Sequence, residues 1–291
     1  MKALLFIELK EGSPIGASRE LFSAAEALGA EAAAVCVENN SGLLDEDVVV
    51  DTIAKKAGEA EADVILFAAT TLGKLTVPRL AARLGGGSVN DAIAVKAEDG
   101  AILATRPVFG GTAQETLKVA AKPAVISIRG GSYPAPEGDP EFEKLEGAAD
   151  VSTRIVDKIE EAGESVNLED ASVIVSGGRG MGTEEDFQLC AQLADVLGGV
   201  VGATRPVIES GWISRTHQVG QSGKIVTPDL YVACGISGAT QHLSGMTGSK
   251  YIIAINKDED APIFSVADIG IVGDVKAILS LIIEEAKKRK A

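Results

Sequence analysis

Aromatic residues, cysteines and histidines are all scarce in this sequence. Of its 291 residues, 4% are aromatic, three are cysteine and two are histidine. The cysteines, Cys36, Cys190 and Cys234, lie far apart in apolar surroundings and form no Cys-x-x-Cys pair. We therefore expect buried, reduced thiols in a cytoplasmic protein, and the spacing argues against a cysteine-ligated iron–sulfur cluster.

Positive charge is also in short supply, and long apolar runs are absent. The formal net charge of −15 repels phosphates and anionic lipids, which argues against nucleic-acid binding and against an anionic membrane surface. No apolar run reaches the roughly 18 residues of a membrane-spanning helix, so we expect no membrane insertion. The apolar stretch that follows Met1 and Lys2 is too short for a signal peptide.

The first half of the chain alternates apolar runs with helical patterns. We predict strands at residues 2–8, 31–37 and 62–69 and helices at 17–29 and 48–60. This order is typical of a parallel α/β sheet.

A Thr/Gly loop, residues 70–73, follows the third of these runs. It caps a helix or binds a ligand, and we favour the cap. Pro78 fits the first turn of the next helix. Residues 92–96, 101–108 and 123–128 alternate like strands, whereas residues 130–150 are rich in Gly, Pro and acid and resemble an extended connector.

A domain boundary is expected near residues 166–171, where the connector gives way to a new buried strand, 171–175. We therefore predict two domains, residues 1–168 and 169–291, each with a parallel-type sheet flanked by helices. Residues 152–161 form either a strand or the start of the linker.

Several loops of the second half suit phosphate binding. Residues 176–182 form a glycine-rich turn before a helix, and the turn contains Arg179. Backbone N–H groups and a guanidinium both pair with phosphate oxygens, although a tight turn with a surface arginine is the alternative. Because the glycines do not follow Gly-x-Gly-x-x-Gly, we do not predict a standard dinucleotide fingerprint.

Further candidate residues follow other predicted strands. Thr204 and Arg205 end the strand 200–203, and Asp274 ends the strand 268–274. The strand ends of open α/β sheets are where ligands bind. Asp274 either contacts a ribose or adenine group or simply caps the helix 275–288. Residues 218–226 form a polar, glycine-rich loop.

The most informative stretch is 231–256, YVACGISGATQHLSGMTGSKYIIAIN. A buried strand leads into a glycine turn, a short helix and a second strand that ends at Asn256. Glycines let the backbone approach a ligand, and the helix start offers free N–H groups to an anion. One of the two histidines, His242, lies on that helix.

Three of these motifs, GISGATQH, AINKDEDAPIF and ADIGIVGD, resemble the flavin-binding signature of electron transfer flavoprotein alpha subunits. The resemblance is dense over residues 171–274 and looser in the first half, through DVILFAATTLGK and PRLAARL. It implies a Rossmann-like FAD-binding C-terminal domain and a nucleotide-binding-like N-terminal domain that contacts a beta subunit. It implies that FAD is bound by Arg179, Thr204, Arg205, Val219, Gly220, Gln221, Ser222, Ser237, Gly238, Ala239, Thr240, Gln241, His242, Asn256, Asp274 and Val275.

The resemblance also implies a place for each group. Residues 237–242 and Arg179 would lie along the pyrophosphate and ribityl chain, and Asn256 and Asp274 towards the adenosine. Arg205, Gln221, Ser222 and His242 would surround the isoalloxazine. Ser222 stands where many members have threonine, and it keeps the hydroxyl.

The implied function is electron transfer by a redox carrier rather than by a stand-alone enzyme. The beta subunit would hold AMP or a second FAD, and electrons would pass from acyl-CoA dehydrogenases of fatty acid oxidation, or from NADH. The acceptor would be a quinone reductase or, in a bifurcating complex, ferredoxin. The alternatives are an NAD(P)-dependent dehydrogenase with its own substrate pocket and a nucleotide-binding regulatory module.

Overall fold

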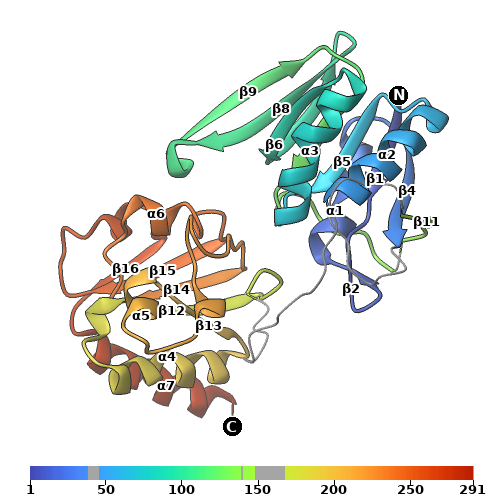
Figure 1. The fold of residues 1–291 in the computed structure, drawn as a ribbon. Helices are drawn as coiled ribbons and strands as arrows, with labels where there is room; N and C mark the ends of the chain where they lie inside the picture. Colours follow the sequence, from blue (N-terminus) through green and yellow to red (C-terminus); the bar gives the residue numbers. More distant parts are fainter. Residues whose placement is uncertain (39–45, 139, 148–167, 291) are drawn as a thin grey trace. The chain divides into compact units, whose positions relative to one another are not determined.

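The structure is a computed structural model that describes residues 1–38, 46–138, 140–147 and 168–290. The chain divides into two compact units, Met1–Glu160 and Glu161–Ala291 (Figure 1). The predicted domain boundary at 168/169 stays a prediction, and the predicted strand or linker at 152–161 lies outside the described residues. No helix in the described part is long and apolar enough to cross a bilayer.

The first unit is built on a six-stranded sheet in the order β11-β4-β1-β5-β10-β6, with every pair parallel. The strands are β1 (Lys2–Phe6), β4 (Glu31–Glu38), β5 (Val64–Ala68), β6 (Gly87–Ala92), β10 (Ala124–Ile128) and β11 (Glu143–Glu146). The helices that flank the sheet are α1 (Gly16–Ala27), α2 (Glu46–Ala60) and α3 (Thr71–Leu84).

Both faces of this sheet are covered. Helix α1 packs on one face, and α2 and α3 on the other. Strand β5 is buried along its whole length, which explains its continuous apolar run. The predicted alternation of strands and helices in residues 2–69 is confirmed.

A second, antiparallel sheet packs on the α1 side of the first unit. Its strands are β7 (Ala94–Glu98), β8 (Ala101–Val108) and β9 (Ala113–Val119). The short pair β2 (Leu9–Lys10) and β3 (Ser13–Pro14) forms a further small hairpin. The sequence predicted strands over β7, β8 and β10 but did not predict β6 or β9.

Part of the predicted connector is a strand. Glu143–Glu146 forms β11, which pairs in parallel with β4 at the sheet edge. Only Leu145 of this strand packs against the core, so its sequence, EKLE, has no apolar period to signal it. Tertiary pairing, not local propensity, makes this strand.

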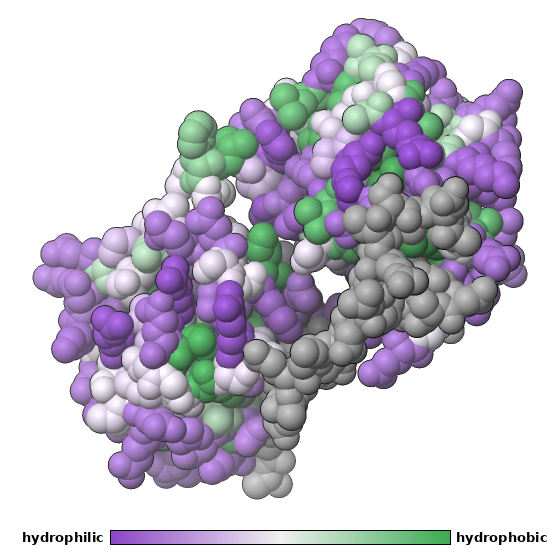
Figure 2. Space-filling model, viewed as in Figure 1, coloured by the Kyte–Doolittle hydropathy of each residue, from purple (hydrophilic) through white to green (hydrophobic). Residues whose placement is uncertain are grey.

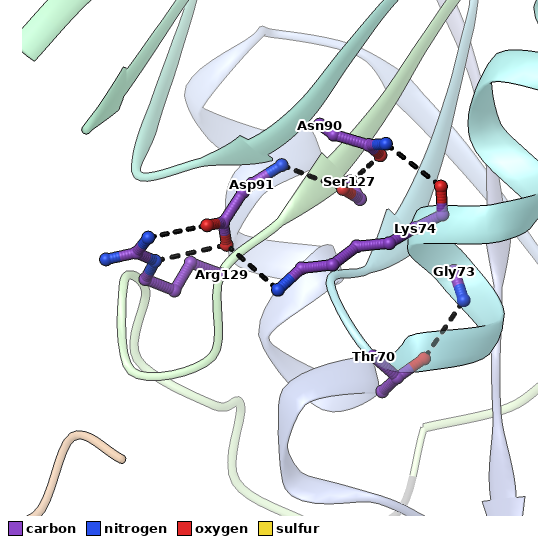
Figure 3. A network of polar contacts seen from close by, with 7 residues as sticks. All are labelled: Thr70, Gly73, Lys74, Asn90, Asp91, Ser127 and Arg129. Carbon is purple, nitrogen blue, oxygen red and sulfur yellow. Dashed lines mark hydrogen bonds and ion pairs between the residues drawn. The ribbon is translucent and has the colours of Figure 1, made fainter. Parts of the chain in front are cut away.

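Pro78 does not lie in the first turn of its helix, and this prediction was wrong. Helix α3 begins at Thr71, so Pro78 lies in its interior. A proline there leaves the carbonyl four residues earlier without its usual N–H donor. That carbonyl belongs to Lys74, and the side-chain amide of Asn90 donates to it at 2.9 Å (Figure 3).

Asn90 belongs to a polar network that ties β6 to β10 and α3 (Figure 3). The Ser127 hydroxyl donates to Asn90 at 2.8 Å and accepts from the Asp91 N–H at 2.9 Å. Arg129 donates to both Asp91 carboxylate oxygens, at 3.1 and 2.5 Å, and the Lys74 ammonium lies 3.7 Å away. Burial raises the pKa of Asp91, but these two cations outweigh it and hold that pKa below its usual value.

The second unit is a five-stranded parallel sheet in the order β13-β12-β14-β15-β16. Its strands are β12 (Val173–Gly177), β13 (Val200–Ala203), β14 (Leu230–Cys234), β15 (Tyr251–Asn256) and β16 (Ile269–Val272). Its helices are α4 (Glu184–Leu197), α5 (Arg205–Glu209), α6 (Thr240–Leu243) and α7 (Val275–Lys290). Helices α4 and α7 cover one face (Figure 1), and residues of the loops cover the other.

Local signals placed most of these elements correctly. Thr183 caps α4 by accepting from the Asp186 N–H, and Gly198 ends that helix at φ +72°. Helix α5 runs from Arg205 to Glu209 because Pro206 fits its first turn. The three cysteines are buried and free, as predicted.

Thr70 offers a test of local stability in the first unit. Its hydroxyl accepts from the Gly73 N–H at 3.1 Å and donates to the Glu8 carboxylate at 2.6 Å. We expect Thr70→Ala to lower the free energy of unfolding by about 1–2 kcal/mol, because a cap and a charge-assisted hydrogen bond are lost. Thr70→Ser keeps both hydrogen bonds and should have nearly the same urea midpoint of unfolding as wild type. Equal midpoints for the two variants would contradict this assignment.

Candidate functional site

The candidate site is the carboxyl edge of the second sheet. All its strands are parallel, so their carboxyl ends lie at one edge. The predicted residues follow those ends in turn: Arg179 after β12, Thr204 and Arg205 after β13, Ser237 to His242 after β14, Asn256 at the end of β15, and Asp274 and Val275 after β16. The fold therefore brings the predicted residues to one edge.

Hydrogen bonds join the loops of this edge. The Gly180 N–H donates to the Gly235 carbonyl at 2.9 Å, and the Thr204 N–H donates to Gly177 at 3.1 Å. The Asn256 side chain donates to the Ile236 carbonyl at 2.9 Å. The loops after β12, β13, β14 and β15 are thus one connected surface.

Glycine is required where the β12 and β14 loops meet. A Cβ on Gly178 would lie 2.4 Å from the Gly235 oxygen, and one on Gly180 2.6 Å from it. Gly235 itself has φ +60°, a conformation that disfavours side chains. A side chain on any of the three glycines would force these loops apart.

The β14 loop also presents unpaired backbone donors. Among the described residues, the N–H groups of Ile236, Ser237, Gly238 and Ala239 donate to no other residue. Consecutive free N–H groups at a strand end form an anion site. The Arg179 side chain belongs to an exposed residue of the neighbouring loop, so the edge suits a pyrophosphate.

The loop 218–224 lies beside α6. The Val219 N–H donates to the Ala203 carbonyl at 3.0 Å, and the Gln221 N–H donates to the Gln241 carbonyl at 2.8 Å. The Gln218 side-chain amide donates to the Ser222 hydroxyl at 2.9 Å. Gln221 and Ser222 are therefore held beside the helix that carries His242.

His242 is buried and uses both ring nitrogens within the protein. Its Nδ1 lies 3.2 Å from the Val219 carbonyl and its Nε2 3.0 Å from the Tyr231 hydroxyl. Burial lowers the pKa of His242 to about 4, so the ring is neutral at pH 7. A carbonyl only accepts, so Nδ1 carries the proton and Nε2 accepts from Tyr231.

Tyr231 is the partner that sequence reasoning missed. It is completely buried on β14, and a tyrosine inside an aliphatic strand was the one available signal. Burial raises the pKa of its hydroxyl, so this group stays protonated and remains a donor. A hydrogen bond from His242 to a ligand stays a prediction.

Two other predicted groups already have protein partners. One Asp274 carboxylate oxygen accepts from the Lys276 and Ala277 N–H groups at 3.0 Å each, so Asp274 caps α7. The Arg205 guanidinium pairs with Glu209 at 2.8 Å on an exposed surface. Contacts of either residue with a nucleotide stay predictions.

One buried hydroxyl of this unit, that of Thr204 just before α5, has no hydrogen-bond partner in the described chain. A buried hydroxyl without a hydrogen-bond partner lowers the stability of the fold unless a ligand supplies that partner. Together with the free N–H groups, Thr204 fits a polar organic ligand, whereas the described residues include no cluster of metal-ligating side chains.

Comparison with protein families gives two matches in chain order. Residues 6–157 match the electron transfer flavoprotein domain, and residues 167–247 match the electron transfer flavoprotein FAD-binding domain. The second match covers the loops that follow β12, β13 and β14, which include the free N–H groups and the unpartnered Thr204 hydroxyl.

Curated relatives agree over most of the chain. The electron transfer flavoprotein subunit alpha of Thermoanaerobacterium thermosaccharolyticum is 46% identical, over 82% of this chain and 75% of its own. The electron transfer flavoprotein subunit alpha of Megasphaera elsdenii is 46% identical, over 80% of this chain and 72% of its own. That of Mycobacterium leprae is 36% identical over 99% of both chains.

His242 makes the stability of the second unit depend on pH. Its pKa is about 4 when folded against a usual 6.5, so between these values the unfolded chain binds a proton that the folded chain excludes. We expect wild-type stability to fall as the pH is lowered through this window, by at most about 1.4 kcal/mol per pH unit from this group. His242→Gln should lose less stability over the same range in urea titrations. Parallel pH profiles would contradict the buried neutral ring.

Proposed function

Because this chain belongs to the electron transfer flavoprotein alpha-subunit family, we propose that it carries electrons as one half of a heterodimer with a beta subunit. Its C-terminal unit binds FAD, as the match to the FAD-binding domain states. We propose that the sixteen residues predicted from the sequence hold the cofactor. The free N–H groups of residues 236–239 at the end of β14 are the single observation that best supports this site.

FAD supplies the redox chemistry by accepting and releasing electrons. In the proposed arrangement, N–H groups of the β14 loop and Arg179 bind the pyrophosphate. The Thr204 hydroxyl gains the partner that it lacks within the described chain. Gln221 and Ser222, held beside α6, orient the flavin ring, and Arg205 places a positive charge near it.

The described residues suggest a carrier more than a self-sufficient enzyme. His242 is neutral and bonded through both nitrogens, so it is not poised as a general base. An NAD(P)-dependent dehydrogenase would need a dinucleotide fingerprint, which the β12 loop does not contain. We propose acyl-CoA dehydrogenases or NADH as donors, and a quinone reductase or ferredoxin as acceptor.

The proposal is tested by producing this chain together with a beta subunit and counting flavins per heterodimer. One FAD and no direct reduction by NADH under anaerobic titration would indicate a carrier supplied by acyl-CoA-type dehydrogenases, with AMP in the beta subunit. Two FAD molecules and rapid reduction by NADH would indicate the bifurcating type. A folded heterodimer without flavin would overturn the proposal.

Arg205 tests the electrostatic part of the site. We expect Arg205→Ala to lower the first one-electron potential of bound FAD by roughly 40–130 mV, because losing a contact of about 1–3 kcal/mol destabilises the reduced ring. Glu209→Gln removes the anion beside this guanidinium and should raise the potential. Arg205→Lys keeps the charge and should fall between Arg205→Ala and wild type in spectroelectrochemical titrations. An unchanged potential in Arg205→Ala with FAD bound would exclude this role.

A further inference from the structure

Gln218 is the one buried amide side chain among the described residues. It is 5% exposed, whereas Ser222, four positions later, lies at the surface. The visible surface of the second unit is mostly hydrophilic (Figure 2), so an exposed serine indicates nothing by itself. A buried amide is different, because it gives up its hydrogen bonds to water and needs partners within the protein. The partner of Gln218 therefore indicates what this residue does.

Backbone hydrogen bonds close the loop 218–224 tightly. The Lys224 N–H donates to the Gln218 carbonyl at 2.8 Å, and the Gly223 N–H donates to the Gly220 carbonyl at 2.9 Å. A Cβ on Gly223 would lie 2.3 Å from the Gln218 carbonyl oxygen, so only glycine lets the chain return this closely. The closed loop therefore brings Ser222 back to the Gln218 side chain.

The Gln218 side chain fixes the direction of the Ser222 hydroxyl. Its Nε2 donates to the Ser222 Oγ at 2.9 Å. An amide NH2 group only donates, so the Ser222 Oγ is the acceptor in this bond and its own proton points elsewhere. No described residue accepts that proton. Ser222 is thus presented as a hydrogen-bond donor to a group outside the described part of the chain.

The contacts that join this loop to α6 leave the Ser222 side chain untouched. The Gln221 N–H donates to the Gln241 carbonyl at 2.8 Å, which fixes the backbone just before Ser222. Within the part of the chain that the structure describes, Gln218 is the only residue bonded to the Ser222 hydroxyl. The backbone contacts therefore place Ser222, and Gln218 alone decides where its hydroxyl points.

We propose that Gln218 is a positioning residue that holds the Ser222 hydroxyl as a donor towards an acceptor atom of the flavin ring. The inference rests on the proposed function, in which Ser222 lies beside that ring. The oxidised ring carries carbonyl oxygens and unprotonated nitrogens, and it gains negative charge when it takes up an electron. Because a hydrogen bond to a charged acceptor is stronger than one to a neutral acceptor, a fixed donor raises the first one-electron potential.

The test is a double-mutant cycle on the flavin-loaded heterodimer, with the first one-electron potential measured by spectroelectrochemical titration. We expect Ser222→Ala to make one-electron reduction about tenfold less favourable, a shift of about 59 mV. Gln218→Met keeps the length of the side chain but lacks the amide, and it should make reduction about three- to tenfold less favourable. In the Ser222→Ala background, Gln218→Met should have no further effect. The control Gln192→Met removes an exposed amide of α4 and should leave the potential unchanged.

A second variant reverses the hydrogen bond while keeping the shape of the side chain. In Gln218→Glu the new carboxylate only accepts, so the Ser222 proton should turn towards it and away from the flavin. The potential should therefore fall further when Ser222 is present than in the Ser222→Ala background. Comparing the two backgrounds cancels the effect of the added negative charge itself.

A merely structural role of Gln218 predicts a different pattern. Gln218→Met would then lower the urea midpoint and the FAD affinity equally with and without the Ser222 hydroxyl, and shifts in potential would be additive. That pattern, or an unchanged potential in both Gln218 variants or in Ser222→Ala, would overturn this inference while the proposed function stands. If the wild-type heterodimer folds but binds no FAD, the proposed function fails and this inference fails with it.

Discussion

The second unit depends on one close backbone contact, between the glycine loops that follow β12 and β14. The Gly180 N–H donates to the Gly235 carbonyl at 2.9 Å, and a Cβ on either side would occupy that space. With the two loops in contact, the N–H groups of residues 236–239 have no acceptor among the described residues. The contact that closes the loops therefore also leaves these donors suited to an anion.

On the far side of the β14 loop, the His242 side chain holds two parts of the unit together through hydrogen bonds. Its ring joins β14, through Tyr231, to the loop that carries Gln221 and Ser222. Burial keeps the ring neutral, and a neutral ring can accept from Tyr231 while donating to Val219. The histidine thus fixes the loop geometry without adding a charge.

Much of this arrangement followed from local sequence patterns. Buried runs such as Leu230–Cys234 and the glycines after them predicted the strands and the loops at the carboxyl edge. Effects of tertiary structure could not be predicted in this way. Strand β11 forms because it pairs with β4. Pro78 is tolerated inside α3 because the Asn90 side chain donates to the Lys74 carbonyl, which the proline leaves without a backbone donor. Tyr231 was missed because sequence spacing does not reveal which buried hydroxyl meets a histidine 11 residues away.

The two units contain similar parallel sheets, but different polar groups lie at the carboxyl edges of those sheets. In the first unit, strands β1 and β5 are adjacent at the point where the strand order reverses, the usual ligand crevice. There the Thr70 hydroxyl bonds to Glu8 and to the Gly73 N–H, so a carboxylate and a helix cap occupy the position of an anion. In the second unit, the N–H groups of the matching loop, residues 236–239, have no acceptor among the described residues. One edge thus carries an acidic group where the other keeps free N–H donors that suit an anion, although both arise from the same fold class.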